Sequence, residues 1–389
     1  HRDLHKEYRR QRQMCIRDRT YFLKFFKLED YDFEKIDPKI GILFEIMINK
    51  TIIKFFLIYV CFFSCSKNEF KIQTLEIQPV LIDSTINIRA LEIDNNKVFS
   101  ASSTGSIYSF DAYNSKVISQ LQYSFDSIVK PNFRALAIKN ENVFAISIGN
   151  PALLFKNGKV VYKEIHPKVF YDSMEFWNEN EGIAVGDFTE NCISIIITRD
   201  GGNNWNKLDC TVFNQIIEGE GFFAASDTNI SIIGNKTWIA SGGKNSRVYF
   251  SNNKGRTWEI YNTPVLQGES TTGIFSMDFY DQNNGYAIGG DYTKPEIDSL
   301  NKIFTVDGGK SWKTIADNSG PGYRSCVQYF PNSNGKKILA VGYKGVDYSS
   351  DYGNTWRNFS EESYYTFRFL NDSVAFAAGK GKISKFVFK

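Results

Sequence analysis

An eight-residue phrase that occurs four times constrains the fold of this chain more than any other feature of the sequence. All copies fit the pattern S/T-x-D/N-x-G-x-S/T/N-W, and they begin at Thr198 (TRDGGNNW), Ser251 (SNNKGRTW), Thr305 (TVDGGKSW) and Ser349 (SSDYGNTW). In such a phrase the acidic or amide side chain and the first hydroxyl satisfy backbone amides of a tight turn, and the glycine accepts a positive φ. The repetition therefore predicts a similar β-hairpin in each of several repeated units.

Longer units surround these phrases with a period of about 40 to 50 residues, which is the range of propeller blades. The segments DSMEFWNENEGIAVGD from Asp172 and FSMDFYDQNNGYAIGGD from Phe275 each give an apolar strand, a turn rich in Asn and Gly, and a strand of small residues. Such units are expected to begin at about residues 86, 131, 171, 219, 271, 322 and 363. The 33 Phe, 21 Tyr and 29 Gly suit many short aromatic strands joined by glycine turns.

The sequence predicts an all-β protein, a seven-bladed β-propeller of four-stranded blades formed by residues 70–389 as one domain. The last unit stops at Lys389 after about three strands, and the segment FKIQTLEI from Phe70 belongs to no unit of its own. We therefore expect this N-terminal strand to complete the last blade, which closes the ring and removes open sheet edges. Rings of six or eight blades remain the alternatives, because unit boundaries are the weakest part of such an assignment.

The N-terminal region is expected to hold an export signal at residues 47–64. Lys50 and Lys54 precede an apolar run, residues 55–63, that is too short to span a bilayer. The run ends in FFSC, which resembles the lipobox of bacterial lipoproteins. This resemblance implies a diacylated Cys65, attachment to the membrane through that lipid, a tether at residues 65–69 and a place in the cell envelope, periplasmic or surface-facing. Phenylalanine stands where leucine and a small residue are commoner, so a plain exported protein or a short anchor is the alternative.

Residues 1–46 precede this signal and are interpreted as a non-native leader or sequencing read-through. They contain the dense basic run HRDLHKEYRRQRQMCIRDR, ahead of a signal that should begin a chain. A genuine basic extension for lipid or nucleic-acid contact is the competing interpretation. These residues are left out of the fold prediction.

The four phrases resemble the Asp-box, or BNR, repeat of sialidase-like propellers. That resemblance implies turns between the third and fourth strands of the blades and structural roles for Asp200, Trp205, Asn253, Trp258, Asp307, Trp312, Asp351 and Trp356. Over residues 70–389 the pairing of IAVGD or YAIGGD with a following DGGxxW is similar to propellers of the photosystem II stability and assembly factor family, a WD/YVTN/BNR-like repeat group. This second resemblance implies an assembly factor, although bacterial members are often labelled oxidoreductases.

Charged residues opposite the expected Asp boxes form a candidate binding mouth. Loops between second and third strands, and between blades, emerge on that face, and a ring mouth of mixed charge is the default binding site of a propeller. The candidate residues are Arg89, Arg134, Asp187, Glu218, Glu220, Lys244, Glu269, Asp291, Arg324, Lys344 and Lys380. Solvated loop charges and strand-end pairs are the alternative. Exposed aromatics at this mouth would favour a glycan partner, and an apolar rim would favour a protein.

Catalytic and cofactor chemistry finds little support in the sequence. The three histidines, His1, His5 and His166, are too few for a zinc site or a convincing triad, so no metal is expected. No G-x-G-x-x-G follows a strand and no cysteine spacing fits haem or an iron–sulfur cluster, so no cofactor is expected. The formal charge of +3 is too small and too evenly spread for a nucleic-acid binder.

A glycoside hydrolase is the first catalytic alternative and a redox enzyme is the second. Arg89, Arg134 and Arg324 could imitate the carboxylate clamp of sialidases through bidentate contacts. However, NFRALA lacks the proline of the FRIP signature, and no tyrosine and glutamate pair can be assigned from spacing. The prediction is accordingly a non-catalytic, monomeric, lipid-anchored scaffold or assembly factor for a protein or glycan partner, with enzyme activity left open.

Two cysteines are expected to face each other across one hairpin. Cys192 begins the third strand of its blade and Cys210 ends the fourth, on either side of the phrase centred near Gly201. A disulfide is predicted in an oxidising periplasm, with two buried thiols as the alternative. Cys326 stays free in either case.

Overall fold

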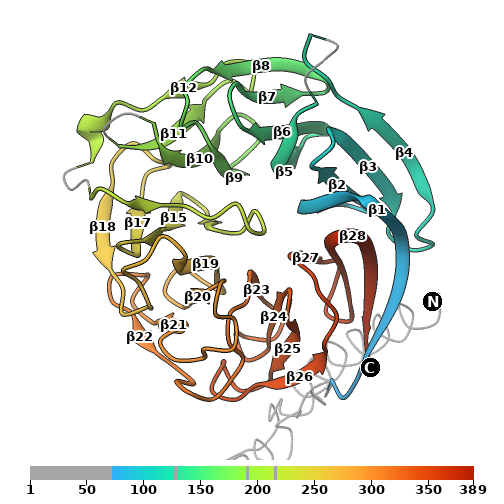
Figure 1. The fold of residues 1–389 in the computed structure, drawn as a ribbon, viewed down its shortest axis with the longest axis vertical. Coiled ribbons are helices and arrows are strands. Elements are labelled where there is room, and N and C mark those ends of the chain that lie inside the picture. The colour runs from blue at the N-terminus through green and yellow to red at the C-terminus, as the bar shows by residue number, and fades with distance from the viewer. Residues whose placement is uncertain (1–71, 127–129, 190–191, 214–216) are drawn as a thin grey trace, which may run out of the picture. The chain divides into compact units, whose positions relative to one another are not determined.

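The computed structural model describes residues 72–389, with the exception of residues 127–129, 190–191 and 214–216. The chain divides into two compact units, His1–Phe70 and Lys71–Lys389. The expected leader, export signal, Cys65 and tether lie outside the described residues. Figure 1 shows the second unit as a ring of β-sheets. Within this described part, no helix has the length and apolar character that a membrane crossing requires.

Six antiparallel sheets form the ring. One six-stranded sheet runs in the order β27 (Thr366–Phe369), β28 (Val374–Phe388), β1 (Leu75–Asp94), β2 (Lys97–Ser102), β3 (Ser106–Asp111) and β4 (Val117–Gln122). The next two sheets consist of β5 (Asn132–Lys139), β6 (Asn142–Ile148), β7 (Ala152–Lys156) and β8 (Lys159–Glu164), and of β9 (Tyr171–Phe176), β10 (Gly182–Phe188), β11 (Ile193–Thr198) and β12 (Asn206–Lys207). A short 3₁₀ helix, Cys210–Val212, follows β12.

The remaining three sheets complete the ring. One holds β14 (Ile230–Ile233), β15 (Lys236–Ala240), β17 (Arg247–Ser251) and β18 (Glu259–Asn262). Another holds β13 (Glu220–Gly221), β16 (Gly242–Gly243), β19 (Thr272–Phe279), β20 (Gly285–Asp291), β21 (Lys302–Thr305) and β22 (Lys313–Thr314). The last holds β23 (Cys326–Tyr329), β24 (Ile338–Gly342), β25 (Gly345–Ser349) and β26 (Arg357–Ser360).

The long strand β1 joins the two ends of the chain in one sheet. Its first part pairs with β28, where Leu75 lies opposite Phe388, and its last part pairs with β2, where Asp94 lies opposite Lys97. The N-terminal strand therefore joins the last sheet, as the sequence predicted. The structure corrects the count of seven separate blades to six sheets, because the units expected at about residues 86 and 363 share β1.

Close packing explains the small residues that end the second strands. A Cβ at Gly186 would lie 2.2 Å from the carbonyl oxygen of Phe170, and one at Gly289 would lie 1.9 Å from that of Gly273. Large aromatic side chains fill the space between neighbouring sheets instead; Trp238 of β15, for example, stacks on Phe279 of β19 with ring centroids 3.9 Å apart. Glycine lets neighbouring backbones approach closely at these two positions, and large aromatic side chains fill the space between the sheets. Together they let the sheets pack as a ring.

The repeated phrases form nearly identical turns between third and fourth strands. In the first, the Asp200 carboxylate accepts the N–H groups of Asn203 at 3.0 Å and Asn204 at 2.9 Å. The Thr198 hydroxyl accepts the N–H of Gly202 at 2.9 Å. The other copies repeat this geometry through Ser251 and Asn253, Thr305 and Asp307, and Ser349 and Asp351. The carboxylate or amide side chain of each copy thus accepts its hydrogen bonds within the turn itself.

A segment between β13 and β14 fills the centre of the ring, and we call residues 223–229 the plug. Figure 1 shows a loop that reaches the ring centre beside β15. The Asp227 carboxylate accepts the N–H of Leu136 in β5 at 2.7 Å and that of Met174 in β9 at 3.0 Å. The Ser226 carbonyl accepts the hydroxyl of Thr366 in β27 at 2.8 Å. Inner strands of three sheets are therefore tied to one central segment.

Candidate functional site

A cavity of about 1300 Å³ opens at the centre of one face, and plug residues Phe223 to Ala225 form part of its wall. It is lined by loops that follow second strands and by connections between sheets, so it lies at the strand ends opposite the Asp-box turns. Of the candidate mouth residues, the cavity brings together Arg89, Arg134, Asp187, Glu218, Glu220 and Lys244. Its lining does not include Glu269, Asp291, Arg324, Lys344 or Lys380.

Two arginines without a carboxylate partner mark one side of this cavity. Arg89 lies near the start of the part of β1 that pairs with β2, and Arg134 lies near the start of β5. Their guanidinium groups donate to the plug carbonyls of Ala225 at 3.4 Å and Ala224 at 3.5 Å. The Arg89 guanidinium also lies 4.0 Å from the ring centroid of Tyr365. Within the described residues neither arginine forms an ion pair.

Both arginines keep their charge at neutral pH, because a guanidinium group is not deprotonated in proteins. Burial lowers the pKa of Arg89, and burial followed by the neighbouring Arg89 charge lowers the pKa of Arg134 to about 10. The fully buried Asp172 carboxylate partly opposes this shift of the Arg134 pKa. The cavity therefore holds two cations whose hydrogen bonds are long, an arrangement that suits an anionic group of a ligand.

The third arginine of the expected clamp lies elsewhere. Arg324 is buried, and its Nε donates to the Asp347 carboxylate at 2.6 Å while Nη1 donates to the Tyr323 carbonyl at 2.8 Å. The sequence-based hypothesis of a three-arginine clamp is therefore wrong, because this guanidinium is already committed to an ion pair. The two remaining arginines are the pair that can meet a ligand.

The carboxylates of the cavity differ in how freely they face it. Glu220 is buried and forms an ion pair with Arg247 at 2.5 Å, so it supports the wall. Asp187 accepts the N–H of Phe222 at 2.8 Å, and burial raises its pKa to about 6. Glu218 and Lys244 are exposed at the rim. The cavity thus presents one exposed acidic residue, Glu218, and two exposed basic residues, Lys168 and Lys244, beside the arginine pair.

Aromatic side chains also line the cavity, and sequence reasoning missed them. Phe223 of the plug stacks on Phe275 with centroids 3.7 Å apart, and Phe275 meets Tyr323 edge-on at 4.8 Å. Tyr292 is 44% exposed, and its carbonyl accepts the Tyr343 hydroxyl at 2.6 Å. A signal was present, because Phe188, Tyr292 and Tyr343 directly follow the GD or G that ends a second strand.

The other expected mouth residues have local roles or lie at exposed strand ends. The Asp291 carboxylate accepts the N–H of Thr293 at 2.9 Å and so stabilises the turn after β20. Glu269 accepts the Thr272 hydroxyl through its backbone carbonyl at 2.9 Å. Lys344 and Lys380 are exposed. For these four residues the structure thus fits the alternative of loop charges and strand-end contacts.

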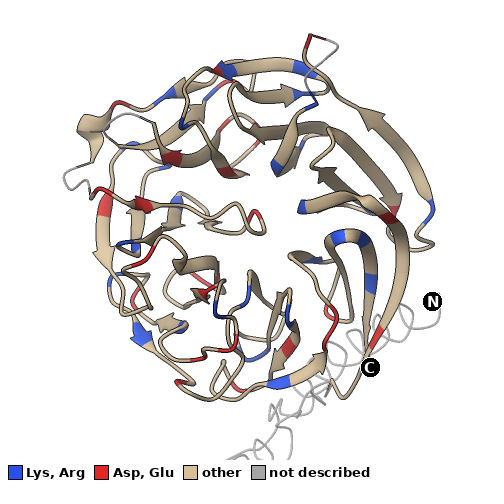
Figure 2. Ribbon diagram, in the orientation of Figure 1, with Lys and Arg blue, Asp and Glu red and all other residues tan. Residues whose placement is uncertain are grey.

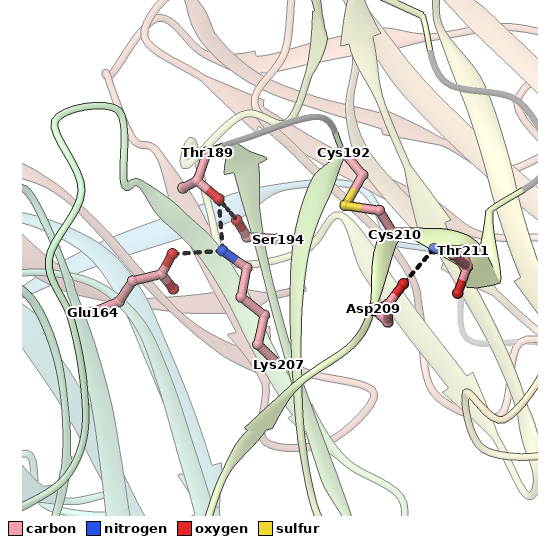
Figure 3. The surroundings of a disulfide bond; sticks show 8 residues. All are labelled: Glu164, Thr189, Cys192, Ser194, Lys207, Asp209, Cys210 and Thr211. Atoms are coloured by element: carbon pink, nitrogen blue, oxygen red, sulfur yellow. Dashed lines mark hydrogen bonds and ion pairs between the residues drawn. A yellow bond between two sulfur atoms is a disulfide. The ribbon is translucent and has the colours of Figure 1, made fainter.

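A disulfide joins Cys192 and Cys210, whose Cα atoms are 5.5 Å apart (Figure 3). Nearby, the Lys207 ammonium meets the Glu164 carboxylate at 2.5 Å and the Thr189 hydroxyl at 2.6 Å. Strand β12 has only two residues, so these links hold the rim of the third sheet where its ladder is short. Cys326 is a free, buried thiol. In the part of the chain that the structure describes, no group of three or more His, Cys, Asp or Glu side chains could hold a metal ion.

Comparison with known proteins shows the fold. No protein-family model and no curated protein sequence matches the chain. The structure "YCF48 bound to D1 peptide" matches with a TM-score of 0.57 and 12% identity, over 82% of this chain and 98% of that one. "Structure of U3-55K" matches with a TM-score of 0.57 and 10% identity, over 81% and 98% of the two chains. "Crystal structure of RRP9 WD40 repeats" matches with a TM-score of 0.57 and 10% identity, over 82% and 100%.

Proposed function

We propose that this protein is a non-catalytic scaffold or assembly factor whose central cavity binds an acidic segment of another protein. The observation that carries the proposal is the pair of unpaired guanidinium groups, Arg89 and Arg134, beside an aromatic wall in a cavity of about 1300 Å³. Arginine and aromatic side chains are the residue types that dominate binding energy at protein interfaces. The fold of a propeller bound to a peptide, YCF48 with D1 peptide, adds support by analogy.

The proposal includes three finer features that the sequence suggested. We propose that the long strand β1 is shared by two structural blades, so that the ring can be counted as seven. We also propose that the protein is a monomer, and that a lipid on Cys65 attaches it to the cell envelope. Mass spectrometry of the protein purified from membranes would test the lipid, because a diacylated N-terminal Cys65 adds the mass of two acyl chains.

Binding of a short acidic peptide tests the cavity directly. The probe is a fluorescein-labelled twelve-residue peptide rich in Glu and Phe, and its counterpart has Gln in place of every Glu. We expect Arg89→Met and Arg134→Met each to weaken binding of the acidic peptide by about tenfold, with a marked dependence on salt. The matched control is Arg256→Met, because that arginine is 60% exposed on the Asp-box side. Equal affinity of the Arg89→Met variant and the wild type would refute the cavity as the binding site.

A glycan is the second candidate ligand, because Tyr292 at the mouth is 44% exposed. An oligogalacturonide, which carries carboxylates on sugar rings, is the matching probe. Binding of this probe but not of the acidic peptide, with loss of binding in Tyr292→Ala, would replace the protein partner by an acidic glycan.

A further inference from the structure

The edge strand β4 lacks the charged residues that protect the other rim strands from pairing. It is the last strand of the sheet that begins with β27, and among the described residues it pairs only with β3. Its sequence, VISQLQ, has no charged residue, and Figure 2 shows its ribbon in tan. The other rim strands of the described residues, β8, β12, β18, β22 and β26, each contain Lys, Arg or Glu. Charges on an edge strand oppose pairing with another chain.

Strand β4 is also long and apolar for an exposed edge. It has six residues, whereas β12 and β22 have two and β18 and β26 have four. Val117, Ile118 and Leu121 are 55%, 50% and 49% exposed. Strand β8, which also has six residues, carries Lys159, Lys163 and Glu164. Length, apolar side chains and the absence of charge therefore coincide in β4.

The backbone of β4 defines which kind of partner fits this edge. Tyr123 donates its N–H to the Gly105 carbonyl at 2.8 Å, toward β3. Because the pattern alternates along the strand, the N–H and C=O groups of Leu121 and Ser119 also point toward β3. By the alternation of antiparallel ladders, the N–H and C=O groups of Gln120 and Gln122 point away from β3. A bulge confines the regular ladder to Ser119–Gln122, and free groups repeat there at the spacing of an extended strand.

We propose that β4 is a docking site for an extended, uncharged strand of a partner protein, added to the sheet by β-augmentation. The free backbone groups require an extended chain, because only such a chain places its own amides and carbonyls opposite them. The uncharged edge and its exposed apolar side chains favour a neutral, apolar segment over a charged one. Self-pairing of two six-residue edges would bury far less than the roughly 1,200 Å² of a stable dimer, which favours a partner over a second copy.

A peptide-addition experiment on the full chain tests this site separately from the cavity. The probe is a fluorescein-labelled ten-residue peptide of alternating Thr and Val, and its control is N-methylated at every second amide, which blocks one hydrogen-bonding edge. Fluorescence anisotropy should show binding of the first peptide only. Ile118→Lys and Leu121→Lys should each weaken it by about tenfold. Val160→Lys on β8, at a site 38% exposed, is the matched control and should leave the affinity unchanged.

Other outcomes would overturn the proposal. Binding of the N-methylated peptide, or equal affinity of the Leu121→Lys and Val160→Lys variants, would remove β4 as the site, as would the absence of peptide binding at millimolar concentration. A dimer in sedimentation equilibrium that disappears in Leu121→Lys would make a second copy the occupant. Circular dichroism checks that the variants are folded, and the two lysine variants provide the test independently of each other.

Discussion

Replacement of Asp227 by alanine tests whether the plug holds the ring together. The carboxylate accepts the N–H groups of Leu136 at 2.7 Å and Met174 at 3.0 Å, and both of these residues are buried. The substitution leaves two buried amides without an acceptor, and each unpaired group costs about 1–3 kcal/mol. We therefore expect the free energy of unfolding to fall by about 2–6 kcal/mol.

Urea unfolding followed by tryptophan fluorescence is the assay, because the midpoint and slope together give the free energy of unfolding. Asp227→Asn should cost about half as much, since its amide can accept one N–H while its NH₂ group faces the other. The exposed Asp372→Ala is the control and should change stability by less than about 0.5 kcal/mol. A loss in Asp227→Ala no larger than that of the control would refute the inference that the plug is a structural centre.

Three further predictions concern the turns, the disulfide and pH. Asp351→Ala removes the acceptor of the Thr355 N–H (2.9 Å) and should lower stability by about 1–2 kcal/mol; if Ser350→Ala, at an exposed position of the same turn, costs as much, the turn assignment is wrong. Cys192→Ala/Cys210→Ala opens a crosslink across 18 residues and should cost about 3 kcal/mol; a urea midpoint equal to wild type under oxidising conditions would contradict this. Burial raises the pKa of Asp187 and Asp278 to about 6, so the folded state binds more protons than the unfolded state between about pH 4 and 6. Stability contributed by these groups should fall as pH rises through that window, and Asp187→Asn/Asp278→Asn should flatten the urea midpoint profile; an unchanged slope would reject the assignment.

The Asp-box turns were predictable because their interactions are local. The hydroxyl of Thr198, the carboxylate of Asp200 and the amide of Gly202 lie within one phrase, so the residue types alone specify the turn. The closure of the ring was predictable for a different reason, since an unmatched strand at one end and an incomplete unit at the other need each other. The number of separate sheets could not be predicted, because the long strand β1 serves two units and no boundary between them is visible in the sequence.

The plug was beyond sequence reasoning because its contacts are distant in the sequence. Asp227 bonds to residues 91 and 53 positions earlier, and no local pattern indicates such partners. Arg89 and Arg134, which the sequence analysis named for the mouth, both line the cavity. Arg324 occupies a similar position, yet a carboxylate 23 residues later captures it. An arginine at the mouth is free to meet a ligand only when no nearby carboxylate pairs with it. Such a partner is visible only in the three-dimensional structure.

The plug also limits how any ligand can enter. Because residues 223–229 bond to inner strands across the centre, the ring is a cup with a floor and not a tube. A polypeptide cannot be threaded from one face to the other, so a segment bound in the cavity must enter and leave through the same mouth. To reach the floor of the cavity, a partner segment would accordingly have to offer either a chain end or a bend.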